Sequence, residues 1–235
     1  MAGQLGPSME ALKNVPFFAR LSGEELQELA GRLVPRRFDS GQVIFHLGDP
    51  GGLLYIIIQG KVKISNSTPE GQEALLAILG AGDFFGELAL LDDAPRSATA
   101  EALQTTEVMT LHHADFVRFL SDNPAFAYHV LQVLAKRIRH LNDQLNDVFF
   151  LDLNGRLART LLNLADSHGR MTDDGRLIDL ALTQTDLAEM TGATRVSINK
   201  TLGRFRRAKW VRMKGRNIVL RDEVALRNLI QMAGG

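Results

Sequence analysis

Residues 34–67 read VPRRFDSGQVIFHLGDPGGLLYIIIQGKVKISNS, and this stretch decides the fold of the first half of the chain. Short apolar and β-branched runs alternate with turn residues, and glycines recur at positions 41, 48, 51, 52, 60, 71, 80, 82 and 86. Short strands separated by glycine turns are typical of an antiparallel roll or barrel. The run LLYIIIQ at 53–59 is apolar enough to be a central strand.

The composition is that of an ordinary globular protein with room for two modest domains. The chain has 235 residues, of which 45% are hydrophobic, and none is cysteine. The absence of cysteine excludes disulfides, thiolate zinc sites and cysteine nucleophiles. The sequence contains no apolar run long enough to span a bilayer, and its first residues lack the features of a secretion signal. We therefore expect a cytoplasmic protein without a membrane partner.

The net charge of zero hides a strong asymmetry between the two halves. From residue 151 onward there are 15 lysines and arginines against 9 acidic residues, which leaves 12 and 18 for the first 150 residues. Residues 195–221 contain ten basic residues and no acidic one. Such a segment suits a polyanion such as nucleic acid, with a solvated helix face as the alternative.

A long helix is predicted to begin at Asn123-Pro124, where Asn123 can act as the cap, and to continue to residue 150. Apolar residues follow at steps of three and four, as in the seam of a coiled coil. The seam predicts a homodimer, and packing against the chain's own domain is the alternative. Its members are Val130, Leu134, Ile138, Leu141, Leu145 and Val148.

The last segment has the pattern of a winged helix-turn-helix. A helix entered through Asn154-Gly155 precedes TQTDLAEMTG at 183–192 and ATRVSINKTLGRFRRA at 193–208. These two predicted helices are joined by a short link with a glycine, which is the helix-turn-helix signature. The strands KWVRM and NIVL around Lys214-Gly215-Arg216 predict a hairpin, or wing.

The stretch GELALLDDAPRSATA at 86–100 carries residues suited to one kind of ligand. Gly86 permits close approach of an anion, Arg96 offers a planar fork for two phosphate oxygens, and Ser97 adds a hydroxyl. Glu87 would repel a phosphate and fits a sugar hydroxyl. A phosphate fused beside a ribose hydroxyl satisfies both ends, as in a cyclic nucleotide. The alternative is a surface ion pair between Arg96 and one of the two aspartates at 92 and 93.

The segment FFGELALLDDAPRSATA at 84–100 resembles the phosphate-binding cassette of the cyclic-AMP receptor protein family, the Crp–Fnr superfamily of bacterial transcription regulators. The resemblance extends over nearly the whole chain. It implies cyclic AMP as an allosteric effector, with Gly86, Glu87 and Leu88 along the ribose and Arg96 and Ser97 on the cyclic phosphate. The adenine-reading positions of the family fall on Leu141 and Asn142, and Leu141 lacks the family's hydroxyl.

The same resemblance places the start of the DNA-reading helix in the major groove. The residues concerned are Thr194, Arg195, Val196, Ser197, Asn199 and Lys200. Arg195 and Lys200 can contact guanine, whereas Val196 can only touch a thymine methyl group, so the half-site differs from that of the family. Lys209, Arg212, Lys214 and Arg216 suit phosphates. A two-fold dimer implies a near-palindromic operator on double-stranded DNA, and a family activator also contacts RNA polymerase.

The fold class we predict is therefore α+β, in three parts. A β-roll of the jelly-roll type spans 1–123, a dimerisation helix and hinge 124–150, and a winged helix-turn-helix domain 151–235. We interpret the protein as a ligand-responsive transcription regulator, not an enzyme, with neither a metal site nor a catalytic residue. Regulators that sense 2-oxoglutarate, haem or no effector with the same architecture remain alternatives.

Overall fold

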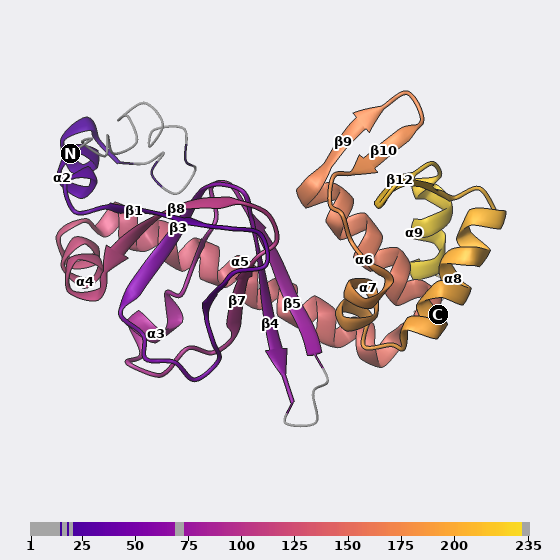
Figure 1. Cartoon of the computed structure of the whole chain (residues 1–235), viewed down its shortest axis with the longest axis horizontal. Helices are drawn as coiled ribbons and strands as arrows, with labels where there is room; N and C mark the ends of the chain where they lie inside the picture. Colours follow the sequence, from indigo (N-terminus) through magenta and orange to yellow (C-terminus); the bar gives the residue numbers. More distant parts are fainter. Residues whose placement is uncertain (1–14, 16–17, 19–20, 69–72, 232–235) are drawn as a thin grey trace. The chain divides into compact units, whose positions relative to one another are not determined.

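The computed structural model describes residues 15, 18, 21–68 and 73–231 (Figure 1). The chain divides into two compact units, Met1–Lys136 and Arg137–Gly235, with the boundary inside the long helix. Gly71 and the outer ends of the predicted domains 1–123 and 151–235 lie outside the described residues. The predicted three-part division remains a prediction, and the two units are treated separately below.

The first unit contains two four-stranded antiparallel sheets, which confirms the predicted roll. One sheet has the order β1-β8-β3-β6 and the other the order β2-β7-β4-β5. The strands are β1 (Val34–Phe38), β2 (Val43–Phe45), β3 (Leu53–Gln59), β4 (Lys61–Ser67), β5 (Glu73–Gly80), β6 (Phe84–Phe85), β7 (Thr99–Ala102) and β8 (Thr106–His112). The predicted central strand is β3, which lies between β8 and β6.

Both faces of β3 are buried, which explains its continuous apolar sequence. Tyr55 and Ile57 face the inside of the roll, where they join a cluster with Val62, Phe85, Ala100 and Val108. Leu54 and Ile56 face the other way, into a second core that includes helical residues. The strand therefore separates two cores, and its side chains alternate between them.

A tight turn at Gly60 connects β3 to β4. Gly60 has φ of +106°, and a β-carbon there would lie 2.6 Å from the Cα of Thr106. The Thr106 hydroxyl is fully buried and donates to the carbonyl of Gln104 at 2.8 Å. Only glycine combines this backbone conformation with such a close approach.

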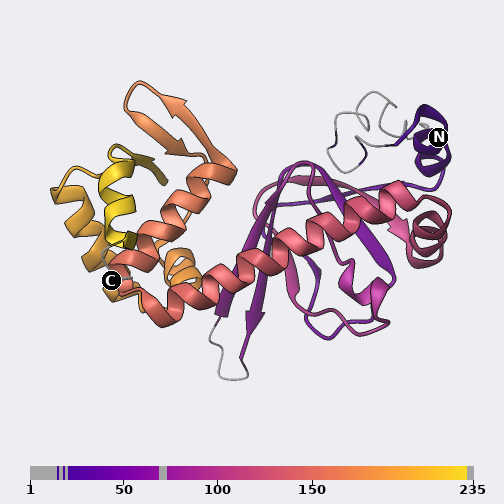
Figure 2. The ribbon, with the colours of Figure 1, turned by 180° about the vertical axis from the view of Figure 1, so that it is seen from behind.

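Among the described residues, the helices that belong wholly or partly to this unit are α2 (Gly23–Ala30), α3 (Leu88–Leu91), α4 (His113–Asp122) and α5 (Pro124–Phe150). The first turns of α5 lie against the roll, where Phe126 and Val130 enter the second core (Figure 2). The predicted start of α5 at Pro124 is confirmed. The backbone carbonyl of Asn123 accepts from the amide of Ala127 at 3.0 Å, as at an N-cap, and its side-chain amide donates to the carbonyl of Phe119 at the end of α4. Capping of α5 by the Asn123 side chain stays a prediction.

The second unit combines helices with a four-stranded sheet of order β11-β12-β10-β9. Its elements after α5 are α6 (Leu153–His168), β9 (Gly169–Thr172), β10 (Gly175–Ile178), α7 (Gln184–Thr191), α8 (Arg195–Arg207), β11 (Val211–Lys214), β12 (Asn217–Leu220) and α9 (Glu223–Gln231). The helix-turn-helix and the β11–β12 wing are confirmed. The hairpin β9–β10 and helix α9, which packs against α6, were not predicted.

Helix α6 begins one residue earlier than the predicted Asn154-Gly155 entry. Its N-cap is Asp152, whose carboxylate accepts from the backbone N–H of Gly155 at 2.9 Å and from the Asn154 amide at 2.7 Å. The first of these hydrogen bonds holds the pKa of Asp152 below its usual value. The ionised carboxylate therefore stabilises the start of α6.

Removal of this cap is expected to destabilise the protein in a pH-dependent way. Asp152→Ala should lower the free energy of unfolding by about 1 kcal/mol at neutral pH. Because the pKa of Asp152 is lowered on folding, its contribution is fully present above the ordinary value of 3.8 and is lost as the pH falls below it. Chemical denaturation at pH 7 and pH 3 measures the difference.

The matched control is Asp173→Ala, which removes an exposed carboxylate from the β9–β10 turn. Equal loss of stability in both variants, or a loss at Asp152 that does not shrink at pH 3, would contradict the capping role.

Candidate functional site

The predicted cassette runs from the end of β6, through the single turn of α3, to the start of β7. Gly86 follows β6 with φ of +80°, and a β-carbon there would lie 2.5 Å from Nη1 of Arg96. The glycine thus leaves the space in which the Arg96 side chain folds back against the end of β6. Two residues ten positions apart are brought together by this turn.

Arg96 is a buried cation, with only 4% of the residue exposed. Its Nη1 donates to the carbonyl of Gly86 at 2.8 Å, and its Nη2 donates to the carbonyl of Leu53 at 2.9 Å. Its Nε is buried and has no hydrogen-bond partner among the described residues. Burial lowers the pKa of the guanidinium, because the charged form has lost its hydration.

The predicted alternative, a surface ion pair of Arg96 with Asp92 or Asp93, is wrong. Arg96 lies inside the roll, and both aspartates are exposed. The Asp92 carboxylate accepts from the backbone N–H of Ala94 at 3.1 Å, and Asp93 lies 3.9 Å from the His113 ring. The Arg96 guanidinium instead contacts backbone carbonyls and aromatic rings. A buried positive charge of this kind suits an anionic ligand.

Glu87 lies beside this charge and is itself buried, with 3% exposed. Its backbone carbonyl accepts from the amides of Leu90 and Leu91, so the residue starts the turn of α3. The negative charge of Glu87 raises the pKa of Arg96, although burial has the larger and opposite effect. A carboxylate in this position can accept hydrogen bonds from hydroxyl groups of a ligand whose anion binds Arg96.

The other cassette residues, Leu88 and Ser97, are exposed at the surface of the roll. Leu141 and Asn142 are exposed on α5, in the second compact unit. The contribution of all four to a ligand site stays a prediction. Residues that sequence reasoning missed are Phe45, Tyr55 and Leu53, which contact Arg96 from β2 and β3. In the sequence they are indistinguishable from ordinary core residues of a strand.

The apolar seam of α5 differs from the prediction at its first position. Val130 is 2% exposed and packs into the core of its own unit, so it is not available to a partner, and Leu134 packs partly against the same core. Leu131, which the sequence analysis omitted, is 61% exposed. We call the exposed set the α5 stripe: Leu131, Ile138, Leu141, Leu145 and Val148. Its members are spaced by seven, three, four and three residues.

The turn between α7 and α8 is built from residues that suit it. Thr183 and Asp186 form a capping box at the start of α7, and Gly192 ends that helix with a left-handed φ of +61°. Thr194 caps α8 by accepting from the backbone N–H of Ser197 at 3.2 Å. The Ser197 hydroxyl accepts from that of Thr194, so both side chains are engaged at the helix start.

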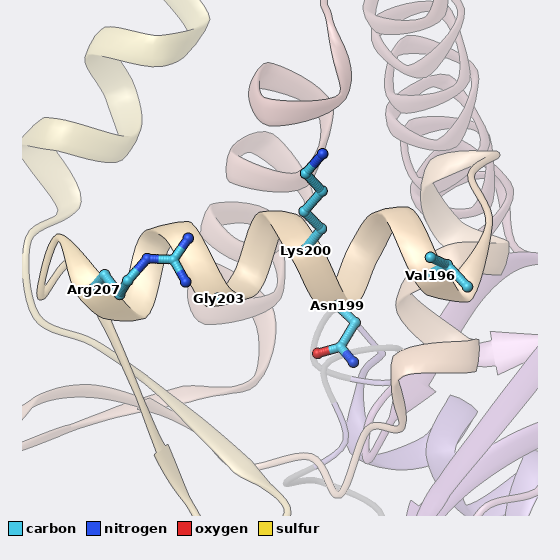
Figure 3. A pocket seen from close by; sticks show the side chains of 5 residues that line it. All are labelled: Val196, Asn199, Lys200, Gly203 and Arg207. Carbon is cyan, nitrogen blue, oxygen red and sulfur yellow. The ribbon is translucent and has the colours of Figure 1, made fainter.

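One side of α8 is buried and the other is open. Ile198, Leu202 and Phe205 pack into the unit. The open side has a shallow hollow over Gly203 (Figure 3), and the residues around it are Val196, Asn199, Lys200, Gly203 and Arg207. Val196 is 78% exposed, and Arg195 is also exposed at the helix start. The predicted reading residues therefore lie on the accessible surface, as a DNA-contacting helix requires.

The wing presents a smaller basic surface than the sequence suggests. Gly215 in its turn has φ of +63°, and Lys214 and Arg216 on either side are exposed. Arg212, which was expected to suit phosphates, forms an ion pair with Asp174 from the β9–β10 turn. Lys214 and Arg216 are the better candidates for phosphate contacts.

Within residues 15, 18, 21–68 and 73–231, no group of three histidine or acidic side chains is arranged to hold a metal ion. A search of the same residues for a membrane-spanning helix found none that is both long and apolar enough. A β-roll with a buried arginine beside a left-handed glycine, followed by a winged helix-turn-helix, is the architecture of ligand-binding transcription regulators.

Comparisons with known proteins identify the family. A family model of the cyclic nucleotide-binding domain matches residues 35–123, and one of the Crp-like helix-turn-helix domain matches residues 155–229. The CRP-like cAMP-activated global transcriptional regulator of Mycobacterium tuberculosis is 35% identical over 217 residues, which cover 92% of this chain and 97% of the relative. The Cyclic AMP receptor protein of Thermus thermophilus is 30% identical over 218 residues, with 93% and 98% covered. The chain belongs to the Crp–Fnr family of transcription regulators.

Solved structures show the same fold. The c-di-GMP-responsive global regulator of Xanthomonas campestris superimposes with a TM-score of 0.75 at 23% identity, covering 85% of this chain and 99% of that one. A CRP-family transcriptional regulator of Thermus thermophilus gives a TM-score of 0.71 at 26% identity, with 85% and 98% covered.

Substitution at Gly86 tests the close approach of Arg96. Gly86→Ala should lower both the melting temperature and the affinity for a cyclic nucleotide, because the new methyl group collides with the guanidinium. Gly48→Ala is the matched control, since Gly48 has a similar φ of +86° but open space around its Cα. Both variants carry backbone strain of about 1–2 kcal/mol. Equal effects of the two substitutions on stability and binding would contradict the geometry.

Proposed function

We propose that the protein is a dimeric transcription regulator that binds cyclic AMP in its roll and a near-palindromic operator with its helix-turn-helix. The observation that carries the proposal is the pair of buried, adjacent charges at Arg96 and Glu87, with the Nε of Arg96 unpartnered among the described residues. A buried guanidinium is costly unless its lost hydration is compensated, and an anionic group of a ligand would supply that compensation at Arg96. Glu87 beside it can accept a hydrogen bond from a ligand hydroxyl. The names of the relatives in Mycobacterium tuberculosis and Thermus thermophilus agree with this ligand.

In this proposal Arg96 holds the cyclic phosphate and Ser97 adds a hydroxyl donor at the rim. Glu87 accepts from the ribose 2′-hydroxyl, and Gly86 and Leu88 line the sugar. Asn142 on α5 can offer both a donor and an acceptor to the adenine edge, whereas Leu141 can offer only apolar contact.

We propose that the α5 stripe joins two copies of the chain. Its positions 131, 138 and 145 repeat every seven residues, as do positions 134, 141 and 148, which is the pattern of a two-stranded coiled coil. A contiguous exposed row of large apolar side chains is unfavourable in water unless a partner covers it. A two-fold dimer would present two α8 helices to successive major grooves about 34 Å apart.

On the operator, Arg195 makes a bidentate contact to guanine and Lys200 reaches a guanine or a phosphate. Val196 contacts a thymine methyl group. Lys214 and Arg216 bind phosphates, which position the protein without specifying sequence. The partners in this proposal are double-stranded DNA and RNA polymerase, and the location is the cytoplasm.

Ligand control requires that the two states of the dimer differ in affinity for cyclic AMP. A difference of about 10⁴-fold moves the populations from 1:99 to 99:1. In this mechanism the bound ligand favours one arrangement of the dimer and of its DNA-binding units. The segment from Phe150 to Asn154 acts as the hinge.

A second candidate keeps the DNA-binding function but replaces the effector with 2-oxoglutarate or none. The observation that favours it is Leu141, which cannot donate a hydrogen bond to adenine. Calorimetry with cyclic AMP, cyclic GMP and 2-oxoglutarate separates the two candidates. We propose no enzymatic activity, and incubation with cyclic AMP followed by a search for AMP tests that statement.

The ligand proposal predicts the behaviour of Arg96→Ala. The affinity for cyclic AMP should fall by roughly ten- to hundredfold, since hydrogen bonds to a charged group are lost. DNA binding stimulated by cyclic AMP should be lost with it, as measured by gel shift on an operator selected from random DNA. Arg37→Ala removes an exposed arginine of the same unit and is the control. Unchanged stimulation in Arg96→Ala would exclude the mechanism.

The dimer proposal predicts the behaviour of Leu145→Asp. A carboxylate in an apolar seam costs about several kcal/mol, so the variant should sediment as a monomer where the parent is a dimer. Its affinity for a full operator should fall, because the two half-sites are no longer bound together. Asn146→Asp places the same charge one position away from the stripe and should leave the dimer intact. A dimeric Leu145→Asp variant would refute the role of the stripe.

A further inference from the structure

The Arg96 guanidinium rests on aromatic rings that lie outside the cassette. The Phe45 and Tyr55 ring centroids are 5.6 Å apart, and Tyr55 stacks on Phe85 at 5.0 Å with an interplanar angle of 12°. Phe45 and Phe85 are 5.8 Å apart, which closes the group. We call these three rings, from β2, β3 and β6, the aromatic floor.

Arg96 lies over one part of this floor. Its Cζ is 4.3 Å from the Phe45 centroid and 5.7 Å from the Tyr55 centroid. Both distances are within the range of a cation–π interaction, and the Phe45 contact is the closer one. The side chain is therefore held by two carbonyls through its terminal nitrogens and by an aromatic face from one side.

These contacts stabilise the positive charge without cancelling it. A carboxylate in the same place would form an ion pair, and an incoming anion would then have to break that pair. Carbonyl oxygens and aromatic faces carry no net charge, so these contacts do not neutralise the guanidinium, although the negative charges of Glu87 and Asp49 also act on it. The two carbonyls accept hydrogen bonds from the terminal nitrogens of Arg96, Nη1 and Nη2. The Nε–H group has no hydrogen-bond partner among the described residues.

We infer that Phe45 is a positioning residue for anion binding: its ring holds the Arg96 guanidinium in the plane that presents Nε–H to the ligand phosphate. Tyr55 contributes its ring from a greater distance. The inference rests on the proposed function and adds two strands, β2 and β3, to a site that the cassette alone does not complete. Fixing the fork before binding reduces the ordering that the ligand must bring about.

A double-mutant cycle in the full-length protein tests this inference. Phe45→Leu removes the ring, and calorimetry with cyclic AMP should show about a tenfold loss of affinity, since a desolvated cation–π contact is worth up to about 2 kcal/mol. In an Arg96→Lys background the same substitution should change the affinity by less than about twofold, because lysine lacks the planar fork. Phe116→Leu removes a buried ring from the second core, away from Arg96, and is the control that should bind as the parent does.

The cycle separates positioning from mere packing. If Phe45→Leu weakens binding equally in the parent and in the Arg96→Lys background, the ring acts on the fold and the inference is overturned. Unchanged affinity in Phe45→Leu overturns it as well, while leaving the proposed function intact. If the parent protein itself binds no cyclic AMP, the proposed function fails first.

A second readout covers the case in which Arg96→Lys binds too weakly to measure. The side-chain Nε–H resonance of Arg96, observed by nitrogen-15 NMR, should be slow to exchange in the parent and should shift when cyclic AMP is added. In Phe45→Leu the same resonance should broaden or exchange faster while the fold, followed by backbone amides, is kept. An equally sharp and protected Arg96 signal in Phe45→Leu would contradict the positioning role.

Discussion

The buried charge of Arg96 sets the chemistry of the first unit. An isolated ion in a protein interior costs about several kcal/mol, so its surroundings must compensate for the lost water. Here the compensation comes from the carbonyls of Gly86 and Leu53 and from the rings of Phe45 and Tyr55. These contacts are neutral, and the nearby Glu87 adds a negative charge that raises the pKa of Arg96. Gly86, which has a left-handed φ, belongs to the same arrangement. A side chain at this position would collide with the Arg96 guanidinium.

Helix α5 changes its role along its length. Its first turns bury Phe126 and Val130 in the core of the roll, and its later turns expose the α5 stripe. The hydrophobic effect therefore acts on one helix in two ways, first within the chain and then, in the proposed dimer, between chains.

In the second unit, packing and ion pairing determine which basic side chains remain exposed. Asp152 is the N-cap of α6, and Thr194 is the N-cap of α8. One side of α8 is buried through Ile198, Leu202 and Phe205. This leaves Arg195, Val196 and Lys200 exposed, while the Asp174 carboxylate engages Arg212. Charge counting alone treats all these cations alike, although they differ in what they can contact.

The antiparallel roll with its glycine turns, the long helix from Pro124, the helix-turn-helix with its wing and the residues of the cassette were determined by the sequence by itself, because periodicity, caps and turns depend on neighbours along the chain. Contacts between distant residues were decided only by the tertiary structure. It buried Arg96 against Leu53, placed Phe45 under the guanidinium, and put Val130 in the core while Leu131 stayed exposed. Such contacts join residues that only the folded chain brings together, so no local pattern records them.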